Sequence, residues 1–453
     1  MKRLFAVAII LSIVPACGGD EAAPPAAAKL EAPQALAGVV PNGEKIASIA
    51  GTLPEGATAP RNPFASFDFK GGAAYPARAQ VRIGDIDVPV GASEAHVPIT
   101  LDRPTPNTII ARVTTRNGSG GTYGISSQHF TAVDTQVIFR PGDPLKKTVR
   151  IPLTKMDAGR HFDVIFPEGV NGGANADGRG KVVAVVGAAP SVEATSGFRK
   201  ARPFYKTGTL AYELKPASVT WSNNGSTDAW STRLPHGRTQ PGNAETGLYL
   251  DPILHQSPLP PLALENGEVV IRSQHLISPI QHEGSYWHHG AAVLTGQRMP
   301  ATQISYGQYE WVAKMPNRRG GWPALWLLPT TGWPPEIDVY EGFGYSQGWN
   351  FSNNHAANIH GGAFGKRTFT AISQINAERV YGMKGFDTSY HGFGVDIAPD
   401  FITWFVDGRE VYQAVNPFRG TTWFPLMNVA VKHQGDYAGG TGEMRVRSFK
   451  VWK

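Results

Sequence analysis

The 453-residue sequence has only one cysteine, Cys17, so no disulfide bond can form within the chain. It has no block of lysine or arginine either: 42 basic and 36 acidic residues leave a formal charge of +6 that is spread along the chain. This pattern gives no indication of nucleic-acid binding. No apolar run beyond the first residues is long enough to span a bilayer. Helical periodicity is nearly absent, which favours strands.

Glycine and proline are abundant, with 52 and 36 residues, and they are spread among β-branched and aromatic residues. This mixture predicts many strands joined by many turns. The length predicts two or three domains, each able to form its own core. We therefore expect an all-β protein, and nothing in the sequence indicates a cofactor or a metal site.

The N-terminus, MKRLFAVAIILSIVPACGG, has the layout of an export signal, with a basic pair, an apolar run and small residues. VPAC resembles a bacterial lipobox, which predicts a signal peptide at residues 1–16 and a lipid on Cys17; ordinary cleavage is the alternative. Residues 17–44 are rich in alanine and proline and predict a tether. We expect an exported monomer, anchored in the bacterial outer membrane by this lipid alone, or otherwise periplasmic or extracellular.

The rest of the chain divides into two parts. Residues 45–190 contain short alternating runs separated by turn residues, which predicts an accessory β-sandwich. All 11 tryptophans lie between Trp221 and Trp452, in the second part, residues 200–453. Small residues at 186–197 predict the boundary. The second part also alternates, with a hairpin signal at Asp407-Gly408, and predicts a larger β-sandwich.

The segment EIDVYE places three acids in one predicted strand. Glu336 and Asp338 share one face, but Glu341 falls on the other face if the strand is regular. A β-bulge at Val339 or Tyr340 adds one residue and returns Glu341 to the face of the other two. The alternative is a solvated strand edge that carries acids by chance.

When acids lie on one face, the charge of each raises the pKa of the others, so one can be ionised while another keeps its proton. Cutting a glycosidic bond requires both forms. Glu336 would be ionised and attack the anomeric carbon, Asp338 would orient it, and Glu341 would carry the proton for the leaving oxygen. Trp322, Trp326 and Trp333 lie close by in the sequence. Indole rings stack on the flat face of a sugar, although tryptophan is also a core residue.

Three runs in this region, YGQYEWVAKMP, GGWPALWLLP and EIDVYEG, resemble glycoside hydrolase family 16, in the laminarinase-like branch with the bulged acid motif. YHGFGVDIAPDFITWFVDGREVY, FPLMNVAV and VRSFKVWK extend the resemblance over most of residues 205–453. The resemblance implies a concanavalin-like β-jelly-roll with a cleft, preceded here by the smaller sandwich. It also implies retaining endo-hydrolysis of β-linked glucans or galactans.

Carried over position by position, the resemblance makes Glu336 the nucleophile, Asp338 its helper and Glu341 the acid/base. Trp322, Trp326 and Trp333 would line the subsites next to the cut. His360, in ANIHGG, matches a cleft histidine, but a histidine satisfied within its strand fits equally well. Arg238 and Asn243 lie in a segment that is similar to early substrate-contacting loops. These nine positions form the predicted site.

The sequence departs from the family pattern in two places: VKHQGDYAGG replaces the usual glycine-rich continuation, and Arg447 stands where many members have an aspartate that helps bind a structural cation. A guanidinium cannot ligate a metal, so we expect no calcium there. In the accessory part, TQVIFRPGDPLKKTVRIPL followed by HFDVIF is similar to a Calx-beta sandwich, without most of its calcium-binding acids. We interpret this part as a spacer or interaction module, although any small sandwich fits the pattern.

The sequence thus predicts a retaining endo-β-glycanase with a polysaccharide as its partner. The expected substrate is a β-1,3- or mixed-linkage glucan or a bacterial exopolysaccharide, with an algal galactan as the alternative. A glucan-binding protein without activity and a transglycosylase are the competing functions. The presence of both Glu336 and Glu341 favours turnover over simple binding.

Overall fold

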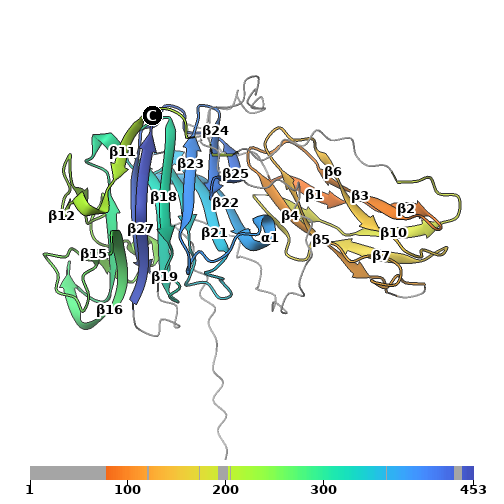
Figure 1. The fold of residues 1–453 in the computed structure, drawn as a ribbon, viewed down its shortest axis with the longest axis horizontal. Coiled ribbons are helices and arrows are strands. Elements are labelled where there is room, and N and C mark those ends of the chain that lie inside the picture. The colour runs from red at the N-terminus through yellow and green to blue at the C-terminus, as the bar shows by residue number, and fades with distance from the viewer. Residues whose placement is uncertain are drawn as a thin grey trace, which may run out of the picture.

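The structure is a computed structural model that describes residues 78–119, 122–172, 174–191, 203–204, 206–363, 365–432 and 441–453. The predicted signal peptide, Cys17, the tether and the expected domain limits at residues 45 and 200 lie outside these residues. Strands dominate the described part of the chain and form a smaller and a larger group (Figure 1). The all-β prediction is confirmed. No helix in the described part is long and apolar enough to span a membrane.

The smaller group is a sandwich of two sheets around its own core. Its strands alternate between the core and the surface, as in β3, where Ala95, Val97 and Ile99 are fully buried. One sheet has the order β6 (Lys146–Pro152), β3 (Glu94–Leu101), β1 (Gln80–Ile83) and β9 (Asn175–Asp177). The other has the order β2 (Ile86–Pro89), β10 (Gly180–Val185), β7 (His161–Ile165), β4 (Ile109–Asn117) and β5 (Asp134–Phe139), with β8 (Val170–Asn171) beside β4.

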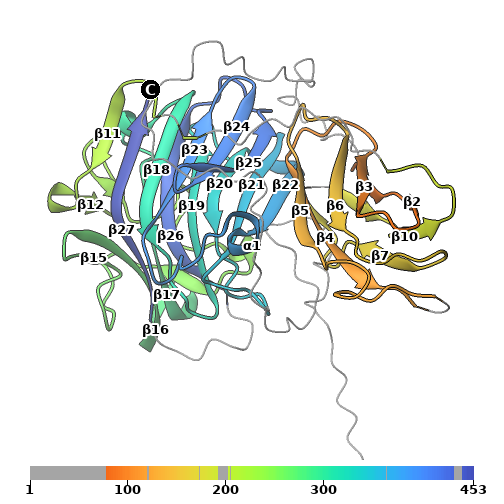
Figure 2. The same cartoon turned by 45° about the vertical axis from the view of Figure 1, so that its right-hand side comes forward.

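The larger group contains the acids in one of two facing layers (Figure 2). We call this layer the acid-bearing sheet. Its strands, in spatial order, are β12 (Trp221–Ser222), β13 (Trp230–Ser231), β17 (Ser285–Thr295), β26 (Trp423–Val431), β19 (Gly321–Pro329), β20 (Glu336–Glu341), β21 (Asn354–Ala363) and β22 (Lys366–Asn376).

The outer sheet faces it and shares β17 with it, because β17 pairs with β16 and β14 as well as with β26. Its other strands are β11 (Leu210–Leu214), β14 (Gly247–Tyr249), β15 (Leu262–Glu265), β16 (Glu268–His282), β27 (Thr441–Trp452), β18 (Gly307–Lys314), β23 (His391–Ile397), β24 (Phe401–Val406) and β25 (Arg409–Val415). Short helices lie at Pro216–Ser218, Pro241–Asn243, Pro300–Thr302 and, as α1, at Ala377–Tyr381.

Alternation along the strands fills the space between these two sheets. On β26, Met427 and Val429 point into the core between the sheets, whereas Leu426 and Ala430 belong to a separate cluster on the opposite face. The core between the sheets also holds four fully buried indoles, those of Trp230, Trp311, Trp404 and Trp423. The larger domain therefore has an interior of its own and a second, partly covered apolar face.

The two domains are joined by main-chain contacts as well as side chains. Between β3 and β4, the Thr108 amide donates to the Gln413 carbonyl at 2.7 Å, and the Val415 amide donates to the Pro106 carbonyl at 2.6 Å. The accessory sandwich thus adds a short extended segment beside β25, and this pairing satisfies polar groups of that strand. Ile110 of the sandwich also packs into the core of the larger domain.

Candidate active site

The acids of β20 are arranged by a bulge. Strand β19 pairs Leu325 with Tyr340 and Trp326 with Asp338, so Val339 is an extra residue on β20. The bulge predicted from the sequence at Val339 or Tyr340 is confirmed at this point. An extra residue moves each side chain that follows it to the opposite face of the sheet from the one it would occupy in a regular strand.

The bulge separates the side chains of β20 into two sets. Ile337, Val339 and Tyr340 all belong to the core between the sheets. Glu336, Asp338 and Glu341 are on the opposite face, in the acid-bearing sheet, and no more than 8% of any of them is exposed. The structure therefore brings the three predicted acids together. Buried carboxyl groups need hydrogen-bond partners, which the neighbouring elements supply.

Each glutamate accepts hydrogen bonds from nitrogen donors. Trp333, in the loop before β20, donates its indole N–H to Glu336 Oε2 at 2.6 Å. Trp322, on β19, donates to Glu341 Oε1 at 2.9 Å, and Asn358, on β21, donates to Glu341 Oε2. Three different elements thus hold the two glutamates in place.

Asp338 has a different set of partners. Its carboxylate Oδ2 lies 3.1 Å from Nε2 of His360, and its backbone carbonyl accepts a hydrogen bond from Trp404 at 2.7 Å. On the far side of the imidazole, Nδ1 lies 2.9 Å from the hydroxyl of Thr370. The predicted cleft position of His360 and its alternative, a satisfied strand histidine, both describe part of this arrangement. His360 is 4% exposed, and its ring nitrogens contact Asp338, Thr370 and Arg367.

The electrostatic setting raises the pKa of all three acids. Burial is the largest cause: it raises the pKa of Glu336 to about 8 and that of Asp338 to about 7, and it raises the pKa of Glu341 well above 4.5. The charge of Asp338 raises the pKa of both glutamates further. The indole N–H groups of Trp333 and Trp322 act in the opposite direction. The site therefore holds at least one proton near neutral pH.

A fourth carboxyl group, that of Glu245, belongs to the same surroundings and was missed by the sequence analysis. It accepts hydrogen bonds from the Tyr249 hydroxyl at 2.8 Å and from Asn243 at 3.4 Å. Burial raises its pKa to about 7, and the charge of Glu336 contributes to the rise, which places the two carboxyls near each other. Its position two residues after the predicted Asn243 was the available signal.

The three predicted tryptophans differ in exposure. Trp322 is only 4% exposed: its N–H donates to Glu341, and its ring packs against Phe343 and Tyr345. Trp326 and Trp333 are half-buried and keep part of their rings open. Trp326 donates its N–H to Asn428 at 2.7 Å, which fixes the indole against β26. Trp326 and Trp333 are therefore better placed than Trp322 to stack on a sugar ring.

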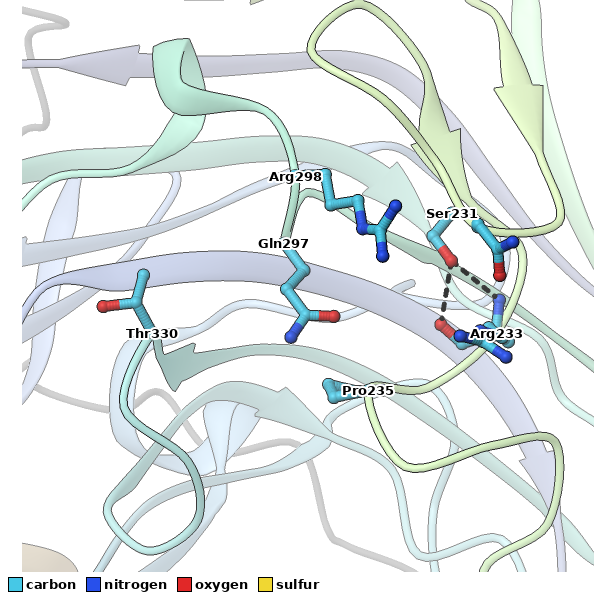
Figure 3. A pocket seen from close by; sticks show the side chains of 7 residues that line it. Ser231, Arg233, Pro235, Gln297, Arg298 and Thr330 are labelled. Atoms are coloured by element: carbon cyan, nitrogen blue, oxygen red, sulfur yellow. Dashed lines mark hydrogen bonds between the residues drawn. The ribbon is translucent and has the colours of Figure 1, made fainter.

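The acids continue into a row of paired residues across the acid-bearing sheet. Asp338 pairs with Trp326, Trp326 with Leu426, Leu426 with Thr295, and Thr295 with Ser231. Directly paired residues of antiparallel strands point to the same face. At the end of this row Ser231 lines a polar pocket (Figure 3).

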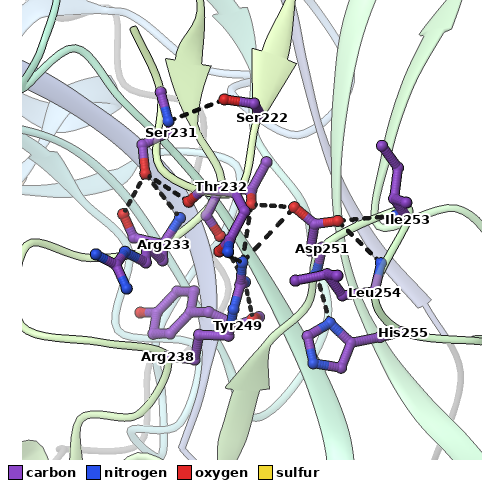
Figure 4. Close-up of polar contacts among 12 residues, drawn as sticks. Ser222, Ser231, Thr232, Arg233, Arg238, Tyr249, Asp251, Ile253, Leu254 and His255 are labelled. Atoms are coloured by element: carbon purple, nitrogen blue, oxygen red, sulfur yellow. Dashed lines mark hydrogen bonds and ion pairs between the residues drawn. The ribbon is translucent and has the colours of Figure 1, made fainter.

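Arg238 is held inside the domain, next to this row (Figure 4). Its guanidinium donates to the carbonyls of Thr232 and Tyr249 at 2.9 and 2.7 Å and to Asn223 Oδ1 at 2.6 Å. It also lies 3.6 Å from Asp251, and only 6% of the residue is exposed. These contacts favour a structural role for Arg238 over the predicted contact with substrate.

Asn358 and Arg447 complete the comparison with the sequence. Asn358 was missed, although it precedes His360 by two residues and so shares its face of β21. Arg447 forms an ion pair with Glu268 at 3.1 Å, at the place where relatives were expected to bind a cation.

Ligand atoms of Glu336, Asp338 and His360 lie within 4.8 Å of one another, which is the spacing of a metal site. Here the same atoms form the contacts described above.

The part of the sequence that contains these acids matches a known protein family. The sequence model of Glycosyl hydrolases family 16 matches residues 281–447, which include all of β18 to β26 and therefore the three acids. This domain belongs to glycosyl hydrolase family 16. The match begins well after the accessory sandwich, so the Calx-beta resemblance of that part stays a prediction.

Two relatives of the family 16 domain come from Rhizobium meliloti (strain 1021). Endo-1,3-1,4-beta-glycanase ExsH is 31% identical over 46% of this chain and 43% of its own length. Endo-1,3-1,4-beta-glycanase EglC is 29% identical over 51% of this chain and 49% of its own length. The chain thus spans less than half of either relative. Among solved structures, the laminarinase catalytic domain from Thermotoga maritima MSB8 is 22% identical, with 54% of this chain and 98% of that chain covered and a TM-score of 0.44.

Proposed function

We propose that the protein is a retaining endo-β-glycanase that cuts internal bonds of a β-1,3- or mixed-linkage glucan or of a bacterial exopolysaccharide. The observation that carries this proposal is the strand β20, on which a bulge gathers three buried acids on one face, each with its own nitrogen partner. The family of the domain and the printed activities of the two relatives support the same reaction class.

The chemistry assigns one step to each glutamate. Glu336 attacks the anomeric carbon as a carboxylate, and Glu341 gives its proton to the departing oxygen, so that the glycosidic bond breaks as an ester to Glu336 forms. Glu341, now ionised, then removes a proton from water, whose oxygen attacks the same carbon and releases Glu336. Asp338, held by His360, positions Glu336 and moves no atom of the substrate.

The first experiment measures turnover. The full chain is incubated with laminarin, mixed-linkage β-glucan, an acidic bacterial exopolysaccharide and agar-type galactan, and new reducing ends are counted. Release from a glucan or from the exopolysaccharide with a mixture of oligosaccharides supports the proposal, whereas release from galactan alone would replace the substrate class. Retarded migration in glucan-containing gels without any release would make the protein a binder. Longer oligosaccharides formed from a short donor would make it a transglycosylase.

The nucleophile can be tested by chemical rescue. Glu336→Ala should lose activity by about four orders of magnitude, because the ester intermediate can no longer form. Azide should restore bond cleavage on an activated glycoside and give a product of inverted configuration. In the matched variant Glu341→Ala, azide should give a product of retained configuration, since the ester at Glu336 still forms. Wild-type activity of Glu336→Ala would show that another residue is the nucleophile.

We also propose that residues 1–16 export the chain and that Cys17 carries a lipid. The full-length protein should then partition into the membrane fraction of the cell that makes it, and Cys17→Ser should move it to the soluble or secreted fraction. Mass spectrometry of the N-terminal peptide checks the modification directly. An unmodified Cys17 within an intact N-terminus would contradict the proposal.

A further inference from the structure

The polar pocket at the end of the row has a volume of about 290 Å³. Its lining comes from separate segments: Arg233 follows β13, Gln297 and Arg298 follow β17, and Thr330 follows β19. Figure 3 shows Gln297 and Arg298 next to each other and Arg233 across the pocket from them. The segments that follow β13 and β17 therefore bring the guanidinium groups of Arg233 and Arg298 to the same pocket.

These two arginines lack the acidic partners that other arginines of the domain have. Arg272 and Arg445, for example, form ion pairs with Glu265 and Glu443. Within the described part of the chain, the guanidiniums of Arg233 and Arg298 make no ion pair or hydrogen bond, and no carboxylate lines the pocket. A guanidinium offers a planar set of N–H donors that fits a carboxylate with two parallel hydrogen bonds.

A third guanidinium, that of Arg238, lies close to Arg233, but Asp251 at 3.6 Å offsets its charge and leaves the charges of the two pocket arginines uncompensated. Burial lowers the pKa of Arg238, the charge of Asp251 raises it, and the charge of Arg233 lowers it again, so Arg233 and Arg238 lie close enough to repel. Asp251 is committed to this interior network, where it accepts from Thr232 and from the amides of Ile253 and Leu254. The pocket thus has an excess of positive charge that an anion would offset.

The register of the sheet fixes where the pocket lies relative to the acids. Asp338 and Ser231 stand at the two ends of the row and are separated by four strand spacings. At about 4.8 Å each, these spacings amount to roughly 19 Å. A polymer that crosses the strands along this row passes Trp326 and then reaches the pocket several sugar units away from the bond that is cut.

We propose that this pocket is a distal subsite for a carboxylate group carried by the polysaccharide, either a uronic acid or an acidic substituent on a sugar. The inference rests on the proposed function, since it names a feature of the polymer that the acids cut. Arg233 and Arg298 bind the carboxylate, while Gln297 and Thr330 are placed to hydrogen-bond neighbouring hydroxyls. The sugars at the acids themselves are neutral, because four carboxyl groups surround them.

The experiment compares one backbone in two charge states. Initial rates of the full chain are measured on a β-1,3-glucan and on the same glucan after light carboxymethylation. The wild type should show a KM for the carboxymethylated polymer about fivefold below that for the neutral one, and this preference should fall as salt rises from 20 to 300 mM. The double variant R233Q/R298Q should have a KM ratio near one. Equal KM values in the wild type would overturn the inference.

A matched control removes two positive charges elsewhere. R82Q/R103Q changes two exposed arginines of the accessory sandwich, and it should keep the wild-type KM ratio. If this variant loses the ratio as well, net charge causes the preference and the pocket does not bind the carboxylate.

Binding without turnover separates this inference from the proposed function. In gels that contain carboxymethylated glucan, the wild type should be retarded more than in gels with the neutral polymer, and R233Q/R298Q should lose the extra retardation. This outcome supports the subsite even if no bond is cut, a result that would refute only the hydrolase. Equal retardation of wild type and double variant would overturn the subsite, whatever the activity on neutral glucan.

Discussion

At the scale of single residues, the nitrogen donors decide how the acids share their protons. Trp322 and Asn358 donate to the two oxygens of Glu341, whereas Trp333 donates to Glu336. An N–H donor stabilises the ionised carboxyl and so opposes the effect of burial. The pKa of Glu341 therefore depends on an indole that is too deeply buried to serve mainly as a sugar platform.

Replacing this donor should move the pH profile. Trp322→Phe keeps an aromatic ring but removes the hydrogen bond to Glu341, so the pKa of Glu341 should rise further. Because Glu341 must be protonated to act as the acid, the alkaline limb of kcat/KM should move to higher pH. Trp326→Phe, which removes the bond to Asn428, is the control and should leave this limb in place. An unshifted limb in Trp322→Phe would contradict the assigned role of the indole.

Stability should depend on pH in the same region. Burial raises the pKa of Glu341 in the folded protein above its ordinary value of 4.5. The stability contributed by its protonated form is therefore complete below about pH 4.5 and is lost as pH rises through the raised pKa. Glu341→Gln cannot ionise, so its melting temperature should exceed that of the wild type by about 3 °C or more at pH 8 and by much less at pH 5. Calorimetry at both pH values provides the comparison, and a constant difference would argue against a raised pKa.

Sequence alone could identify the acids but only part of what surrounds them. The spacing of Glu336, Asp338 and Glu341 predicted the bulge, because a regular strand would have left one acid in the core. Asn358 and Glu245 were missed because their closeness to the acids comes from pairing across the sheet and from a loop. Arg238 shows the reverse: the sequence predicted a contact with substrate, but the buried guanidinium donates to carbonyl groups of its own domain.

At the scale of elements, the segment beside β25 is the least predictable feature. Thr108 and Gln413 are 305 positions apart, and no periodic pattern connects them. The alternating runs predicted strands in both domains. They could not predict that the segment around Thr108 pairs with β25, because alternation shows which residues form a strand and not which distant strand it pairs with. The Thr108 hydroxyl adds to the pairing, since it lies 3.0 Å from both the amide and the carbonyl of Gln413.

Removing this hydroxyl should weaken the whole protein. Thr108→Ala leaves buried groups of Gln413 without one partner, which should lower the free energy of unfolding by about 1–3 kcal/mol. Urea unfolding followed by circular dichroism measures the change. Thr154→Ala alters an exposed threonine of the same sandwich and should change the midpoint little. If the two variants unfold alike, the segment contributes nothing to the joint between the domains.

At the scale of the whole molecule, a buried ion pair crosses between the domains. Arg140 of the accessory sandwich lies 3.1 Å from Glu410 of β25, and only 1% of the Glu410 side chain is exposed. A carboxylate buried this deeply is costly without its partner. The sequence predicted that the accessory sandwich is a spacer or interaction module. In the structure, its Arg140 also neutralises a carboxylate that is buried in the family 16 domain.

Breaking the pair should reveal this dependence. Arg140→Met should lower the free energy of unfolding by about 3 kcal/mol, because it leaves the Glu410 charge buried. Adding Glu410→Gln should restore part of the loss, since the stranded charge is then gone. Arg82→Met, in an exposed pair with Asp177, should cost less than about 1 kcal/mol. A double variant that is the sum of its single variants would mean that the two residues are not coupled.

The indoles buried between the two sheets make that coupling directly visible. All 11 tryptophans belong to the family 16 domain, and Trp230, Trp311, Trp404 and Trp423 are fully enclosed in its core. Tryptophan fluorescence therefore reports the unfolding of the family 16 domain, because the accessory sandwich contains no tryptophan. A substitution at Thr108 or Arg140 that displaces the fluorescence transition has acted across the joint, so the wild-type chain needs no attached dye to show whether its two halves unfold together.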